Sequence, residues 1–220
     1  MGLKFQDVEL CWLGHSAILI KSADIVIYID PYKLPEIVDD RADYVFITHS
    51  HYDHCSIEDI KKIIKPKTKI ICPADVQSKL RHVGENIEVI LAEPDSSADF
   101  EDVKFWAVRA YNTNKDAHTR EEDWVGYIIQ VGETSIYHAG DTDFIPEMKK
   151  IKCDVAFLPV GGTFTMNGGE AAKAAAIIKP KLAVPIHYGT IVGEKKDAEV
   201  FVKLASAEGI DARIFEKEKI

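Results

Sequence analysis

Short apolar runs separated by polar turns dominate the first quarter of the chain. Residues 8–12, 17–20 and 25–29 are rich in isoleucine, leucine and valine, and each run is bounded by polar or small residues. Apolar runs of about four to eight residues between turns are typical of buried β-strands. Residues 44–47 repeat the pattern with two aromatic side chains. The pattern therefore predicts three early strands and a fourth that follows a longer connection.

Helical and strand patterns alternate through the rest of the chain. Apolar residues that recur on one stripe predict helices, the first with Ser56 as its N-cap and Pro66 as its end. Gly84 is expected to close the second helix. The predicted helices span residues 56–64, 74–81, 170–178 and 196–207, with a helical turn at 146–150. The further predicted strands span residues 69–72, 87–91, 103–108, 125–129, 135–138, 154–158 and 182–186.

Length and composition indicate one soluble α/β domain over residues 1–220. The chain has 220 residues, of which 46% are hydrophobic and 29% charged, and this suits one large domain better than two. The sequence shows no linker or low-complexity segment. Periodicity by itself would also allow an ordinary doubly wound parallel sheet.

The charge and the cysteines limit which partners the protein is expected to bind and indicate its cellular location. The net charge is −9 and no basic stripe appears, which argues against a nucleic-acid partner. No apolar run reaches membrane-spanning length, and the N-terminus lacks the apolar core of a signal peptide. The four cysteines form no CxxC pair, which favours free thiols and a cytoplasmic location. A homo-oligomer is left open.

Potential metal ligands gather directly after the predicted strand at residues 44–47. His49, His51, Asp53 and His54 lie within six positions and include three of the eight histidines of the chain. Imidazole nitrogens and carboxylate oxygens are the ligands that suit zinc and its first-row neighbours. That concentration disfavours a polar loop with unrelated histidines. The stretch predicts a metal site where a strand ends.

The pattern His49-x-His51-x-Asp53-His54 resembles the signature of the metallo-β-lactamase-fold hydrolases. The resemblance continues at residues 137–142, which contain His138 and Asp141, and at residues 185–189, which contain His187. It is closest to the small single-domain branch that includes the ascorbate-6-phosphate lactonases. The resemblance implies an α/β protein with an αββα sandwich: two mixed β-sheets packed face to face, covered by helices, with all ligands at one edge.

The resemblance also implies two metal ions, with zinc favoured over manganese or iron. Site one would use His49, His51 and a third histidine, and site two would use Asp53, His54 and His187. Asp141 would bridge the two ions. Related sequences commonly have the third histidine where this chain has Asn112, so His118 in the polar loop at 111–123 is expected to replace it. Asn112 or water remain the alternatives.

The expected activity is hydrolysis of an ester, lactone or phosphodiester bond of a small molecule by a metal-bound hydroxide. Asp53 would orient the hydroxide, and His15 and His138 are candidates for protonating the leaving group, although His138 could instead support a ligand. Asp30, after the third strand, is expected to orient a ligating imidazole. Glycines at residues 161–162 could let backbone approach a ligand.

Two other functions are alternatives to hydrolysis. A di-iron oxidoreductase on the same fold usually has glutamate where this chain has His51, and it usually carries a flavin-binding domain as well. A metal-stabilised binding protein without turnover is the other alternative. The presence of Asp53 and Asp141 argues against it. Hydrolysis is therefore the expected activity.

Overall fold

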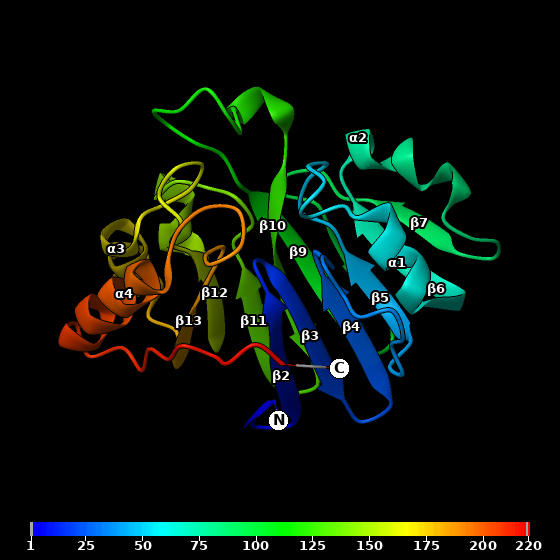
Figure 1. Ribbon diagram of the computed structural model, residues 1–220, viewed down its shortest axis with the longest axis horizontal. Coiled ribbons are helices and arrows are strands. Elements are labelled where there is room, and N and C mark those ends of the chain that lie inside the picture. Colours follow the sequence, from blue (N-terminus) through cyan, green and yellow to red (C-terminus); the bar gives the residue numbers. More distant parts are fainter. Residues whose placement is uncertain (1, 219) are drawn as a thin grey trace.

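The computed structural model describes residues 2–218 and 220, and it contains two β-sheets packed face to face with helices on their outer sides (Figure 1). In the larger sheet the seven strands lie side by side in chain order. Its strands are β1 Leu3–Phe5, β2 Val8–Gly14, β3 Ala17–Ser22, β4 Ile25–Ile29, β5 Ala42–Phe46, β6 Ile64–Cys72 and β7 Glu88–Leu91. Strands β1 to β4 are antiparallel neighbours, whereas β4 to β7 run parallel.

The second sheet has six strands in the order β13-β12-β11-β10-β9-β8. They are β8 Ser97–Asp99, β9 Val103–Arg109, β10 Val125–Val131, β11 Thr134–His138, β12 Val155–Pro159 and β13 Leu182–Ile186. Strands β8 to β11 are antiparallel, and β11, β12 and β13 are parallel. Each sheet is therefore mixed, as the family resemblance implied.

Helices cover the outer side of each sheet. In Figure 1, α1 and α2 flank the larger sheet, and α3 and α4 lie beside β12 and β13 at the opposite side of the molecule. The helices are α1 Ile57–Ile63, α2 Ala74–Gln77, α3 Gly168–Ile178 and α4 Lys195–Ala207, with 3-10 helices η1 Lys79–His82, η2 Arg120–Glu122 and η3 Pro146–Lys150. Within the described residues, none of the helices has the length and apolar character needed to cross a membrane.

Alternation along the strands of the larger sheet builds two apolar layers. Successive strand residues point to opposite faces. In β5, Tyr44 and Phe46 therefore pack against the second sheet, whereas Val45 packs towards α1 and α2. Phe46 meets the ring of Tyr127 from β10 edge to face, with the ring centroids 5.1 Å apart. These buried layers fix the two sheets relative to each other and to the helices.

The structure confirms the fold class and most of the predicted elements, with three corrections. Pro66 does not end a helix, because α1 ends at Ile63 and Pro66 lies inside β6. The helix predicted at 74–81 is broken at Ser78 into α2 and η1. The short strands β1 and β8 were missed, since three residues carry too little periodicity to stand out.

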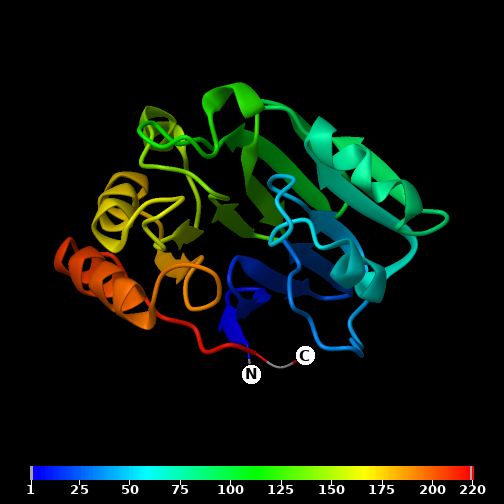
Figure 2. The same cartoon turned by 45° about the horizontal axis from the view of Figure 1, so that its top comes forward.

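Parallel strands place the candidate ligands at one edge of the sandwich. The carboxyl ends of neighbouring parallel strands meet at the same edge of a sheet. The segments after β4 and β5 therefore lie beside the tip of the β2–β3 hairpin, and those after β11, β12 and β13 face them from the other sheet. In Figure 2 the loops at this edge come forward, while both termini lie at the far end of the molecule.

Candidate metal centre

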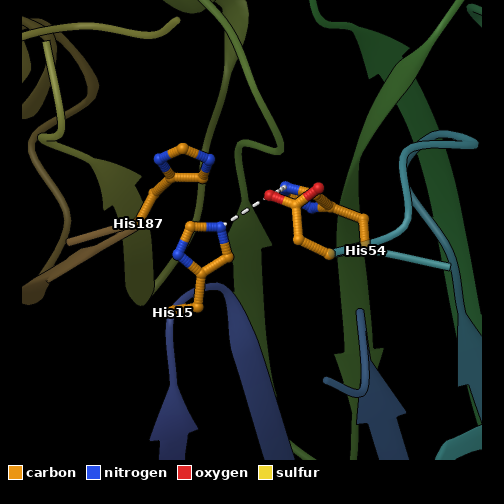
Figure 3. Close-up of side chains that lie close together, drawn as sticks. His15, His54 and His187 are labelled. Atoms are coloured by element: carbon orange, nitrogen blue, oxygen red, sulfur yellow. Dashed lines mark hydrogen bonds and ion pairs between the residues drawn. The ribbon is translucent and has the colours of Figure 1, made fainter. Parts of the chain in front are cut away.

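Eight side chains expected to carry the chemistry meet at this edge, and they come from five separate segments. His15 lies at the tip of the β2–β3 hairpin, and Figure 3 shows its ring beside those of His54 and His187. The others are His49, His51, Asp53 and His54 after β5, His118 in the loop between β9 and β10, Asp141 after β11 and His187 after β13. The ninth expected residue, His138, has a different place.

Asp30 orients the ligands that follow β5, as the sequence predicted. Its carboxylate is fully buried, and Oδ2 accepts a hydrogen bond from Nδ1 of His54 at 2.7 Å. Thr48 donates to the same carboxylate twice, from its backbone N–H at 2.8 Å and from its hydroxyl at 2.7 Å. With Nδ1 of His54 protonated, the lone pair of Nε2 points into the site. The carboxylate of Asp30 therefore fixes both the start of the loop after β5 and the tautomer of His54.

The hydroxyl of Thr48 transmits this order to His49. Because Thr48 Oγ1 donates its proton to Asp30, its lone pairs are free to accept from Nδ1 of His49, 3.0 Å away. This leaves Nε2 of His49 as the ring atom that faces the site. Asp30, Thr48 and His49 thus form a chain that presets the tautomer of a candidate ligand.

The first group of converging ligand atoms contains His49, His51 and His118, with one ring nitrogen from each lying within 4.8 Å of the other two. Nε2 of His49 is 3.1 Å from Nδ1 of His51. The indole of Trp124 packs against all three rings, with centroid distances of 4.8 to 5.3 Å. Trp124 was missed from the sequence, and its position at the end of the polar loop, directly before β10, was the available signal.

The second group contains Asp53, His54 and His187, and the structure adds His15 to it. Nε2 of His15 is 2.9 Å from Oδ2 of Asp53, and that oxygen is 3.7 Å from Nε2 of His54. The rings of His15 and His187 lie 4.1 Å apart between centroids. His15 is therefore placed to hold Asp53, while its own Nδ1 is buried without a hydrogen-bond partner among the described residues.

Asp141 lies between the two groups. Its Oδ2 is 3.2 Å from Nε2 of His118 and 3.0 Å from Nε2 of His187, and its Oδ1 is 3.3 Å from Nε2 of His54. Ligand atoms held tetrahedrally about 2.0 Å from one Zn²⁺ are about 3.3 Å from each other. The carboxylate thus has ligand-like spacing to histidines of both groups.

The donor atoms of this centre fit divalent metals. Within the described part of the chain, Nε2 of His54, His118 and His187 is buried without a hydrogen-bond partner, and so is Oδ1 of Asp141. Buried polar atoms are rarely left unpaired unless an ion or another group satisfies them. Imidazole and carboxylate are suitable donors for zinc, manganese and iron. The residues of the centre therefore fit a divalent metal ion.

The surroundings also shift the protonation states of the candidate ligands. Burial keeps the pKa of His49 well below its usual value, so this ring is neutral. Burial works to raise the pKa of Asp141, but the neighbouring His187 and His54 outweigh it and hold that pKa well below its ordinary value. Burial opposes the charged form of His54, yet Asp141 and Asp30 keep its pKa well above the usual range. A metal would displace that proton on binding.

Asn112, the alternative to His118, braces the loop. Its Nδ2 donates to the backbone carbonyls of Ala117 and Phe164, each at 2.8 Å, and its backbone N–H donates to the carbonyl of His118 at 2.7 Å. These bonds fold the loop back so that His118 lies beside Asp141. The geometry thus brings His118 into the first group and gives Asn112 a supporting place.

His138 is the one expected catalytic residue that the structure keeps away from the substrate side. Its ring is fully buried, with Nε2 2.9 Å from the carbonyl oxygen of Ser16 and Nδ1 accepting from the N–H of Gly140 at 3.2 Å. Both ring nitrogens are therefore used by the backbone, and neither can pass a proton to a leaving group. The supporting role that was left open for His138 agrees with this geometry.

Several site residues have a backbone conformation that is uncommon outside glycine. His15, Asp30, His118 and His187 have φ of +53°, +46°, +58° and +59°. Strained backbone of this kind is concentrated at functional sites, where the surrounding packing maintains it. Gly161 has a related packing role: a Cβ there would lie 2.6 Å from the carbonyl oxygen of His187. This glycine makes room for a candidate ligand of the metal.

Comparison with known proteins agrees with this centre. Residues 9–187 match the family model of the beta-lactamase superfamily domain. A UPF0173 metal-dependent hydrolase of Archaeoglobus fulgidus is 31% identical in an alignment of 232 positions that covers 94% of each chain. The chain therefore belongs to the beta-lactamase superfamily and, within it, to the UPF0173 metal-dependent hydrolases.

Solved structures show the same architecture. A candidate metal-dependent hydrolase from Parabacteroides distasonis superposes with a TM-score of 0.88 at 31% identity, covering 99% of both chains. A diiron beta-hydroxylase from Streptomyces venezuelae superposes with a TM-score of 0.75 at 16% identity, covering 97% of this chain and 53% of the other. The second likeness is one of fold alone. The family relationship makes the chain a metal-dependent hydrolase.

Proposed function

We propose that this hydrolase uses two divalent metal ions, zinc being the best suited, to cleave an ester-, lactone- or phosphodiester-type bond of a small molecule. His49, His51 and His118 would hold one ion, and Asp53, His54 and His187 the other. The observation that supports two ions is the position of Asp141 within 3.3 Å of ring nitrogens from both groups. When bound, such ions lower the pKa of water and polarise the bond under attack.

The residues of the chain supply positioning and charge. Asp53, held by His15 at 2.9 Å, presents a fixed carboxylate that can accept a proton from an attacking water. His15, the other expected proton donor, keeps Nδ1 buried and does not line the cavity beside the centre, so we assign it the role of holding Asp53. Asp30 acts through His54 and Thr48 and never touches the reacting atoms. The single domain over residues 1–220, the cytoplasmic location and a homo-oligomer stay predictions.

Metal content and turnover, measured together, test the proposal. Purified protein should contain two metal ions per chain and hydrolyse a member of a panel of lactones, esters and phosphodiesters. Asp141→Asn should lower kcat by several orders of magnitude while the fold persists, because a neutral amide ties the two metal groups together poorly. Asp102→Asn, an exposed carboxylate, is the matched control. A loss below about tenfold, or about 1.4 kcal/mol of barrier, would remove Asp141 from the mechanism.

A further inference from the structure

A cavity of about 470 Å³ opens beside the metal centre, and one side of it is apolar. Five of the candidate ligands line it, and the remaining lining residues are Tyr52, Ala117, Phe164 and Ile191. Three of these are large side chains that stay exposed to 64%, 40% and 37%. Exposed apolar side chains that gather at a functional pocket are typical of a binding surface.

The three large apolar residues come from separate segments that are each held in place. Tyr52 follows β5, and its ring meets that of Tyr32 edge to face at 5.9 Å. The carbonyl of Phe164 accepts the amide of Asn112, which links its segment to the His118 loop. The segment of Ile191 is closed by a hydrogen bond from Gly189 N–H to the Gly193 carbonyl at 3.1 Å. These contacts hold the backbone segments that carry Phe164 and Ile191 at the cavity.

Positive side chains do not line this cavity. Among the described residues that form its wall there is neither lysine nor arginine. Lys115 pairs with Asp143, Lys79 donates to the carbonyl of Ser50, and Lys33 lies over the Tyr32 ring at 5.3 Å. Recognition of a phosphate or carboxylate generally uses arginine, lysine or free backbone N–H groups.

The glycine-rich segment after β12 offers no substitute for those cations. The N–H of Gly162 donates to the carbonyl of Met166, and the N–H of Thr163 donates to the carbonyl of Gly161, both at 3.0 Å. These donors are therefore used within the segment. An anionic group of a substrate that lies away from the reacting bond would therefore meet no lysine or arginine in the cavity wall. It would instead meet apolar side chains and the carboxylates of Asp53 and Asp141.

We infer that the substrate carries an uncharged apolar acyl, alkyl or aryl group next to the scissile bond, and that Tyr52, Phe164 and Ile191 bind this group. The inference rests on the proposed function, because it assigns the non-reacting part of the substrate. It disfavours sugar phosphates and other substrates with a charged group remote from the reacting bond. Each methylene group buried against this surface contributes to affinity in proportion to the area removed from water.

Hydroxamates of different tails test the inference on the zinc-loaded protein, because their head group binds metal and their tail samples the cavity. Calorimetric Kd values should fall by about two- to fourfold per added methylene from acetohydroxamate to butanohydroxamate and hexanohydroxamate. Succinic monohydroxamate, which has the same carbon number as butanohydroxamate and a terminal carboxylate, should bind more weakly. Equal Kd values along the series, or tighter binding of the succinic compound, would overturn the inference.

Variants locate the binding surface. Phe164→Ser and Ile191→Ser should flatten the dependence of Kd on tail length while metal content and the Kd of acetohydroxamate stay unchanged. Leu204→Ser, at a side chain in α4 that is 42% exposed, should leave the series as in the unaltered protein. If the variants retain the full dependence, the assigned surface is wrong. If the zinc-loaded protein binds none of the four compounds, the proposed metal function fails and the inference with it.

Discussion

At the residue scale, the centre depends on side chains that fix other side chains. Asp30 lies outside the groups of candidate ligands, yet it orients His54 directly and His49 through Thr48. Asn112 has the same relation to His118, since its amide folds the loop that carries this histidine. A metal ligand is therefore useful only together with the groups that orient it.

The assignment of His118 gives the first prediction. His118→Ala should bind fewer than two zinc ions per chain, because the first group would keep only His49 and His51. Asn112→Ala should bind both ions with a weaker affinity, by about 10- to 100-fold, since it removes a brace and not a ligand. Zinc stoichiometry and affinity of the two variants, measured side by side, decide the matter. Two tightly held ions in His118→Ala would contradict the assignment.

The buried cysteines give a prediction about alkaline pH. Burial raises the pKa of Cys55 and of Cys72 to about 12 from an ordinary value of 9.0. Both thiols are therefore neutral in the folded protein and react slowly, because the thiolate is the nucleophile. At pH 8 we expect modification by a disulfide reagent to be more than about a hundredfold slower in folded than in denatured protein. Mass spectrometry of the labelled peptides measures this.

The raised pKa of Cys55 and Cys72 also makes the stability of the fold depend on pH. A pKa raised by folding means that the folded state holds the proton more tightly than the unfolded chain. The contribution of these thiols to stability is complete below pH 9 and is lost as the pH rises towards 12. Denaturant midpoints should therefore fall across this window, and Cys72→Ala should reduce the slope. A midpoint independent of pH between 9 and 12 would show that the thiols ionise as freely as in the unfolded chain.

At the scale of elements, strands deliver the chemistry and helices cover the sheets. Asp30 follows β4, the histidine-rich segment follows β5, Asp141 follows β11 and His187 follows β13. Each strand is a buried apolar segment whose register is set by its neighbours, so the residue after its last hydrogen bond has a defined position. Helices α3 and α4 pack outside this arrangement, where they affect stability more than chemistry.

Helix α3 offers a prediction that separates the two effects. The side chain of its N-cap, Asn167, accepts hydrogen bonds from the N–H groups of Gly169 and Glu170, at 2.9 and 3.0 Å. The N–H of Asn167 in turn donates to the carboxylate of Glu170 at 2.9 Å. Asn167→Ala should cost about 1 kcal/mol of unfolding free energy and lower Tm by about 2–4 °C. Asn114→Ala, at an exposed loop position, should change stability by less than about 0.5 kcal/mol. Equal effects of the two changes would mean that the cap is not stabilising.

At the scale of the whole molecule, the metal centre joins the two sheets. His49, His51, Asp53 and His54 come from the edge of the seven-stranded sheet, whereas Asp141 and His187 come from the six-stranded sheet. An ion that binds ligands from both sheets adds to the apolar core a second connection between them. Bound metal therefore favours the folded state of the entire sandwich.

Removal of metal should lower stability as well as activity. A ligand present at about 100 times its Kd stabilises the native state by about 2.7 kcal/mol. For a chain of this length that corresponds to a decrease in Tm of about 5–10 °C on chelation. Calorimetry before chelation, after chelation and after zinc is restored measures the change and its reversal. An unchanged Tm in protein shown to be free of metal would contradict the structural role.

The sequence determined most of the strands, the longer helices and the identity of most candidate ligands. Apolar runs such as Tyr44 to Ile47 are local signals, and His49, His51, Asp53 and His54 are neighbours in the chain, so no tertiary information was needed to find them. The resemblance supplied the remaining candidates and the two-sheet architecture. The sequence did not predict the break between α2 and η1 at Ser78, or that Pro66 lies inside β6. Both features depend on packing and not on propensity.

Only the tertiary structure decided which side chains meet. His138 lies two residues from Gly140 and three from Asp141 in the chain, yet its ring turns to the carbonyl of Ser16, away from the centre. The partner of His15, Asp53, is 38 residues away in the sequence. Trp124 packs on His49 and His51 from a distant segment as well as on nearby His118. Contacts of that range follow from the pairing of strands and the packing of sheets, which place distant segments at one edge and leave the direction of each ring to its hydrogen bonds.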